Sequence, residues 1–428
     1  MNFTGLSLDQ APPLQAPVRF FITAPLFGML AALMIMFVDP ALFESRYSMQ
    51  SIAVTHLFTI GLFAMVMLGA LQQMLPVLAG VSLPKAGSVA VVSHAALTVG
   101  VLFMVPSLLW SEPTLATVAA VALGVGFFTI LAAIAVAMAK ISFFTPTVKA
   151  MITAVVFAFF TVVAGLYLLG GYASGSIGEM HSRLLDIHSV WAVFGFGGIL
   201  IIGVSFQVLP MFYVTPSFRR FYNNVVIPLI VSGLVAWMFS QLMLEEFAIT
   251  GRFVIVLFFI AFAAAVIKKM IERRRPVSDV TVWYWRSSAV FLGLGALLWL
   301  LDTWLDGEYI MIVSVLIGGG FILSVITGML YKIVPFLVWF HLNASGYMTI
   351  PTMREMLNER MAWIQYGLHM ASVFFLIAAF WFPLLIKPAG LALFVSMLLL
   401  EINLLKVLKI YRETKKREPD FVMDVAGV

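Results

Sequence analysis

The chain of 428 residues contains no cysteine, which excludes disulfide bonds, thiolate-bound metal ions and iron–sulfur clusters. Charged residues are also scarce: they make up 11% of the sequence, whereas a typical soluble domain has about a quarter. Hydrophobic residues account for 62%, and the mean hydropathy is +1.07. This composition predicts a single all-α membrane domain in contact with a lipid bilayer along most of its length.

Twelve apolar stretches are long enough to cross a bilayer. With a cytoplasmic N-terminus, twenty of the 25 Lys and Arg residues fall on the inner side, four fall on the outer side, and Lys332 lies within a span. The positive-inside rule therefore predicts that both termini are cytoplasmic, which agrees with an even number of spans. An anionic inner leaflet explains the net charge of +5 without a nucleic-acid partner. The predicted spans are about 20–38, 52–79, 89–110, 114–138, 149–172, 185–213, 225–244, 252–269, 286–304, 309–338, 363–384 and 388–408.

An octet with glycine first, Gln or Lys fifth and proline last occurs three times: 69–76 (GALQQMLP), 203–210 (GVSFQVLP) and 328–335 (GMLYKIVP). Chance would supply such a match roughly 0.02 times in a chain of this composition, so the octets indicate an internal repeat. They fall at the inner ends of the second, sixth and tenth spans. A period of four spans predicts three arcs of four helices around a pseudo-threefold axis, with repeat units of about 20–138, 149–269 and 286–408. Common transporters repeat in units of six or three spans instead.

The fifth residue of each octet is polar: Gln73, Gln207 and Lys332. Threefold symmetry would bring these side chains together as a polar ring near the inner face. Alternatively, each extends toward the membrane surface or caps nearby carbonyl groups, as polar residues at helix ends commonly do.

Two histidines occupy similar positions in the repeat. His56 precedes Gln73 by 17 residues, and His188 precedes Gln207 by 19. An imidazole within an apolar span is costly and is a common metal ligand, so both are candidate ligands, although a hydrogen bond across helices is the alternative. The third repeat has no histidine at this level and offers Met311 as its soft side chain.

His181 lies two helical turns before His188. It is either part of a metal-collecting site at the outer mouth or an ordinary residue of a solvated helix start. The other three histidines, His94, His341 and His369, lie toward the cytoplasmic side and give no comparable signal.

Twelve spans, a three-by-four arrangement and the positions of His56 and His188 resemble subunit one of the heme-copper oxidases. In that family the second-span histidine is an axial ligand of a low-spin heme, and the sixth-span histidine binds copper. The family's histidine pair in the seventh span and its two histidines in the tenth have no counterparts here. The resemblance therefore implies neither a high-spin heme nor a complete copper centre, and the chain is more similar to the NnrS family, which is associated with resistance to nitric oxide.

This resemblance implies a protein of a bacterial inner membrane that binds heme, with copper as a second candidate cofactor, in nitric oxide or redox-stress handling. His56 is the expected heme ligand, and His188 and Met311 are both candidates for a second axial position. An electron donor or a respiratory complex is the expected partner. Whether the chain is an enzyme or an oligomer stays open, as do two other functions: a heme-free metal or small-molecule transporter, and a noncatalytic assembly partner of a respiratory complex.

Overall fold

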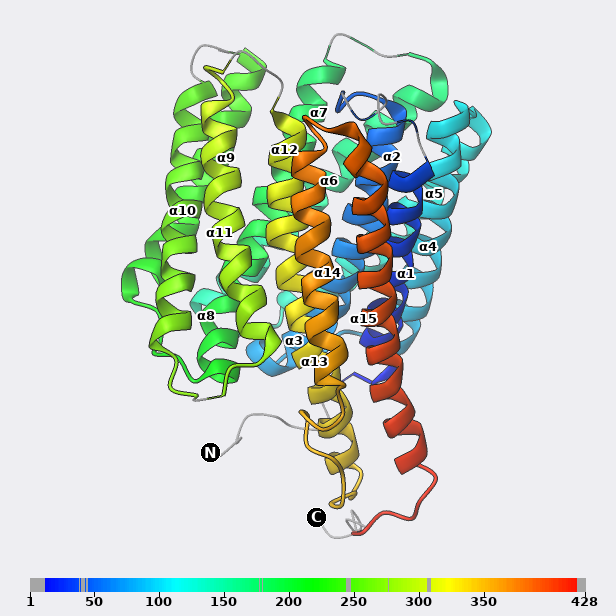
Figure 1. Cartoon of the computed structure of the whole chain (residues 1–428), viewed down its shortest axis with the longest axis vertical. Coiled ribbons are helices and arrows are strands. Elements are labelled where there is room, and N and C mark those ends of the chain that lie inside the picture. The colour runs from blue at the N-terminus through cyan, green and yellow to red at the C-terminus, as the bar shows by residue number, and fades with distance from the viewer. Residues whose placement is uncertain are drawn as a thin grey trace.

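A computed structural model shows a bundle of long helices (Figure 1). It describes residues 12–37, 39, 43, 45–176, 178, 180–243, 248–275, 277–305 and 309–421. Helices account for 83% of the structure, and no strand occurs in these ranges. The predicted all-α class is therefore confirmed.

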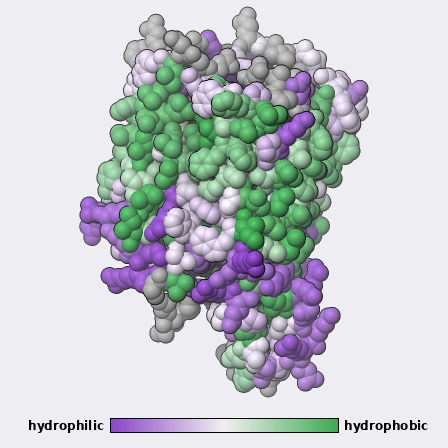
Figure 2. Space-filling view, viewed as in Figure 1, coloured by the Kyte–Doolittle hydropathy of each residue, from purple (hydrophilic) through white to green (hydrophobic). Residues whose placement is uncertain are grey.

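The described chain contains twelve helical segments that are long and apolar enough to cross a membrane, as predicted. Figure 2 shows hydrophobic side chains over most of the visible face and hydrophilic side chains concentrated toward the end where α15 leaves the bundle. The spans, with the helices that form them, are Gln15–Phe37 (α1), Met49–Ala79 (α2, η3, α3, η4), Ala86–Trp110 (α4), Pro113–Met138 (α5), Pro146–Ser174 (α6), His181–Tyr213 (α7, η5, α8), Tyr222–Met243 (η6, α9), Ala248–Glu272 (α10), Val280–Leu301 (α11), Ile310–Ala344 (α12, η8, α13), Glu359–Ala378 (α14) and Pro383–Thr414 (η9, α15).

The second, sixth and tenth spans are the most buried. The share of buried residues in their apolar windows is 67%, 78% and 67%, whereas the other nine spans reach 56% at most. The three spans that carry the octets therefore form the inner part of the bundle, and the remaining spans cover them.

The octet repeat extends further than the octet itself, because a second glycine stands eight residues before the first one in all three copies. Both glycines of each copy pack closely against the preceding span. If the earlier glycine carried a Cβ atom, that atom would lie 2.5–2.6 Å from a phenylalanine of the preceding span. A Cβ at the octet glycine would lie 2.1–2.9 Å from the residue seven positions before that phenylalanine. These contacts are Gly61–Phe27 and Gly69–Phe20, Gly195–Phe157 and Gly203–Ala150, and Gly320–Phe291 and Gly328–Tyr284. The repeat thus includes a pair of spans with one common packing geometry.

Each inner span also changes from an α-helix to a π-helix at the same place in the repeat. The three π-helices have 6, 8 and 9 residues, and each ends five residues before the octet glycine. Wide π turns inside helices are often found at functional sites. They are η3 (Thr59–Ala64), η5 (Trp191–Gly198) and η8 (Val315–Leu323).

The octet prolines do not end all three helices. Pro76 and Pro210 lie within four residues of a helix end, at Ala79 and Tyr213. Pro335, by contrast, lies inside α13, which continues to Ala344. A proline in the octet therefore does not fix where the helix stops.

Candidate functional site

A cavity of about 880 Å³ lies among the three inner spans. Its walls come mainly from apolar side chains, and its size falls within the range of about 300–1,000 Å³ that is usual for small-molecule and cofactor sites. Residues that line it from the inner spans include Thr55, His56, Phe63, Met67, His188, Ser189, Ala192, Phe196, Met311, Ser314 and Ile322.

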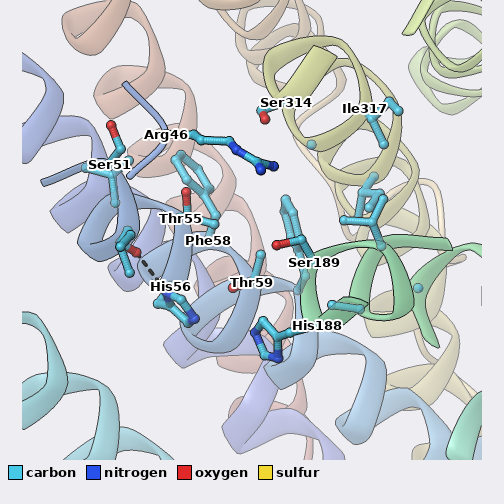
Figure 3. Close-up of a pocket in the computed structure, with 18 of the residues that line it drawn as sticks. Arg46, Ser51, Thr55, His56, Phe58, Thr59, His188, Ser189, Ser314 and Ile317 are labelled. Carbon is cyan, nitrogen blue, oxygen red and sulfur yellow. Dashed lines mark hydrogen bonds between the residues drawn. The ribbon is translucent and has the colours of Figure 1, made fainter. Parts of the chain in front are cut away.

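His56 and His188 meet in this cavity. Their ring centroids are 6.1 Å apart, and the ring planes differ by 21°. Figure 3 shows the two rings side by side, one from α2 and the other from α7. The sequence placed the two histidines at similar depths, and the structure shows that they share one site.

Each ring is oriented by a hydrogen bond to a backbone carbonyl. The Nδ1 of His56 lies 2.8 Å from the Ile52 oxygen, and the Nδ1 of His188 lies 3.0 Å from the Thr161 oxygen. Since a carbonyl only accepts, Nδ1 carries the proton in both neutral rings. The Nε2 atom of each ring therefore keeps a free electron pair, which is the state in which imidazole binds a metal ion.

The two histidines stand at the same position relative to the π-helices, although they lie at different distances from their octets. Each histidine stands three residues before the first residue of its π-helix. His188 is two residues farther from its octet than His56, and η5 is two residues longer than η3. Counting back three residues from η8 gives Ile312, so the third repeat has an apolar residue at the matching position.

A glycine makes room for the His188 ring. A Cβ at Gly165 of α6 would lie 2.8 Å from Cε1 and 3.3 Å from Nδ1 of that ring, closer than ordinary contacts. The same helix supplies the Thr161 carbonyl one turn earlier. The sixth span thus carries the histidine, and the fifth span fixes its position.

Charged side chains also line the cavity. Arg46 pairs with Asp186, and Arg252 donates to the Trp299 carbonyl at 3.1 Å while its guanidinium lies 4.8 Å from the Trp299 ring centre. In Figure 3 the Arg46 side chain extends above the two histidines. Burial disfavours the charged form of Arg46, but the Asp186 carboxylate and nearby groups outweigh it and raise the pKa of the guanidinium above its ordinary value.

The sequence did not single out Arg46 or Arg252. They are two of the four basic residues that the positive-inside rule places on the outer side. Because basic residues on that side are rare, their position in the sequence is a signal from which both could be predicted as candidate site residues.

The remaining predicted site residues lie in different places. Met311 lines the cavity. His181 begins α7, as expected for a helix start, but it is buried rather than solvated, and its ring packs against Tyr172 with centroids 4.9 Å apart. It is not among the residues that line the cavity.

The structure brings no two of the predicted inner polar residues into a hydrogen bond or ion pair. Gln73 is buried and its amide has no partner among the described residues, whereas Gln207 is exposed. Lys332 pairs with Asp279, and its amine lies 5.6 Å from the centre of the Tyr213 ring. The polar ring stays a prediction.

The donor set suits a metal held by two imidazoles. Within the described ranges, no group of three or more His, Cys, Asp and Glu residues could hold a metal ion.

No protein-family model matches the chain, and no curated protein matches it either. The residues of the cavity therefore carry the functional argument.

Proposed function

We propose that this chain is a multi-pass heme protein of a bacterial inner membrane, in which His56 and His188 hold one heme in the central cavity. The observation that carries this proposal is the pair of imidazoles with free Nε2 atoms and ring centroids 6.1 Å apart. Two rings on opposite sides of one metal ion have centroids roughly 6 Å apart, because each metal–nitrogen bond is about 2 Å and each ring adds about 1 Å.

The surroundings also suit a porphyrin. A heme is a large apolar disc with two carboxylates at one edge, so it needs an apolar cavity with cationic groups at its rim. The cavity provides apolar walls, and Arg46 and Arg252 lie on it. Bound there, a heme would supply a one-electron redox couple.

His188 is the better second ligand. Met311 lines the same cavity, but His188 lies next to His56 and already has its Nδ1 proton bonded to a carbonyl. If both histidines held the iron, no position would be left for a gas, and the site would suit electron transfer better than gas binding. Copper fits less well, since the described residues contain no group of three or more His, Cys, Asp and Glu side chains that could hold a metal ion.

The wider role follows from the resemblance to the NnrS family. We infer that the heme accepts electrons from a respiratory donor in nitric oxide or redox-stress handling. The repeated glycine contacts and π-helices in the three inner spans support an arrangement of three four-helix arcs. The distribution of Lys and Arg supports cytoplasmic termini.

Heme content tests the proposal. Purified wild-type protein should give a pyridine-hemochrome signal, and His56→Ala should lose most of it because one of the two imidazoles that would hold the heme is removed. His94→Ala is the matched control. The His94 Nε2 lies 2.8 Å from the Thr23 hydroxyl, and neither residue lines the cavity, so the loss of His94 should leave the heme content unchanged. Wild-type protein without heme would sink the proposal and favour small-molecule transport through this cavity.

A further inference from the structure

Buried polar side chains concentrate on one side of the bundle. Eleven polar side chains in the described ranges are at most 1% exposed, and seven of them lie on α13, α14 and α15. They are Ser324, Thr327, Gln365, His369, Ser372, Ser396 and Asn403. We call this set, together with Tyr284 of α11, the polar column; the four helices pack against one another.

Hydrogen bonds in the column run between helices. Tyr284 donates to the Gln365 side-chain oxygen, and the Gln365 amide donates to Ser396 at 2.8 Å. Ser324 and the Nε2 of His369 are 2.8 Å apart. Ser372 differs, because it donates to the His369 carbonyl of its own helix, as Ser205 does to Ile202 elsewhere in the bundle. The bonds between helices form two groups, one from Tyr284 through Gln365 to Ser396 and one between Ser324 and His369. Both groups include α14, and together they reach four helices.

Two atoms of the column lack a protein partner. Thr327 Oγ1 and His369 Nδ1 are fully buried and have no hydrogen bond among the described residues. A buried polar atom without a partner costs about 1–3 kcal/mol, and ordered water usually fills such positions. These atoms mark places where water would complete the column.

The column reaches a cavity at both ends. Ser372 lines the large cavity and lies one turn after His369 on α14. At the other end, the Tyr331 hydroxyl lies near Asn403, and Tyr331 also lines a second cavity of about 90 Å³. That cavity also has Asp279 and Lys332 in its wall, and it is large enough for several water molecules.

We propose that the polar column is a hydrated proton path from the second cavity, on the predicted cytoplasmic side, to the large cavity. An electron that arrives in an apolar cavity adds a negative charge there, which is costly unless a proton arrives to balance it. Hydroxyl, amide and imidazole groups with intervening water relay that proton by exchanging hydrogen bonds. The destination of the proton rests on the proposed function, whereas the hydration of the column does not.

The first test measures water access and does not need heme. Because the chain has no cysteine, Thr327→Cys introduces a single thiol into the column. Silver ions are added to the predicted cytoplasmic face of inside-out vesicles, and the thiols that remain free are then labelled with maleimide. Silver should reduce the labelling of the Thr327→Cys thiol at least tenfold more than it reduces the labelling of the Ser107→Cys thiol. Ser107 is a matched control, since it is 4% exposed, bonds within its own helix and lines neither cavity. Equal protection of both thiols would overturn the proposal.

The second test measures proton movement. Reduction of the heme in sealed inside-out vesicles should take up protons from the outer solution, which a pH indicator detects. Gln365→Leu removes the bonds to Tyr284 and Ser396 and should slow uptake at least tenfold with heme content unchanged. Uptake at the wild-type rate would contradict the proton path. Absence of heme would instead contradict the proposed function and leave the thiol result to decide on the column.

Discussion

Replacing Gly165 by alanine should displace the His188 ring while leaving His56 in place. The added Cβ would lie 2.8 Å from His188 Cε1, whereas ordinary contact begins at 3.4 Å, so the ring must retreat by about 0.6 Å. Metal–ligand distances tolerate changes of only about 0.2 Å. The same retreat stretches the bond from Nδ1 to the Thr161 carbonyl, now 3.0 Å, and costs about 1 kcal/mol. We therefore expect the His188 axial bond to be lost.

The absorption and electron paramagnetic resonance spectra of the purified Gly165→Ala protein test this expectation. The heme that the protein retains through His56 should change from six-coordinate low-spin to five-coordinate high-spin. Gly170→Ala on the same helix is the control, because nothing lies within 4 Å of the position of its Cβ. A low-spin spectrum that is unchanged in Gly165→Ala would refute His188 as the second ligand.

Two further predictions concern stability. Gly320→Ala places a Cβ 2.5 Å from Phe291 and should destabilise the protein by about 1–3 kcal/mol, whereas Gly318→Ala, with nothing within 4 Å, should not; thermal unfolding in detergent compares the two. Burial disfavours the Asp279 carboxylate, but Lys332 outweighs it and holds the pKa of Asp279 below its ordinary 3.8. The stabilisation from this carboxylate is thus present above pH 3.8 and is lost as the pH falls through the lowered pKa. Lys332→Met should raise that pKa toward 3.8 and so reduce the stability that the wild type gains as the pH rises through this range. Melting curves with the same pH dependence as those of the wild type would contradict the ion pair's role.

The sequence was sufficient for the twelve spans and for locating the three octets within them. Apolar stretches of adequate length are direct signals of membrane crossing, and the octets identified the second, sixth and tenth spans, which the structure shows to be the most buried. The earlier glycine of each copy was also visible in the sequence. Its significance depends on the phenylalanine it faces, and that pairing appears only when the two spans are packed together.

The site was predictable in part. His56 and His188 stood out because titratable rings are rare in apolar spans. Their spacing of 17 and 19 residues does not show that they meet, since the two-residue difference is taken up by the longer π-helix after His188. A sequence pattern with a period of 3.6 residues per turn does not predict where an α-helix changes to a π-helix or how long the π-helix is.

The charged residues of the cavity were not predictable by the same reasoning. Arg46 precedes the second span and Arg252 lies near the start of α10, so in the sequence each is only one of the four basic residues on the outer side. Tertiary packing alone brings both to the cavity that holds the histidines. The buried polar column escaped prediction for a related reason, because isolated Ser, Thr and Gln residues in different spans show no common pattern until the helices meet.

The most direct test of the account is the near-infrared magnetic circular dichroism spectrum of the oxidised, purified wild-type protein, measured beside its heme content. This spectrum distinguishes two histidine ligands from a histidine and a methionine. We predict about one heme per chain with bis-histidine ligation through His56 and His188. Protein without heme, or a histidine–methionine spectrum that points to Met311, would contradict the claim that these two imidazoles hold the cofactor.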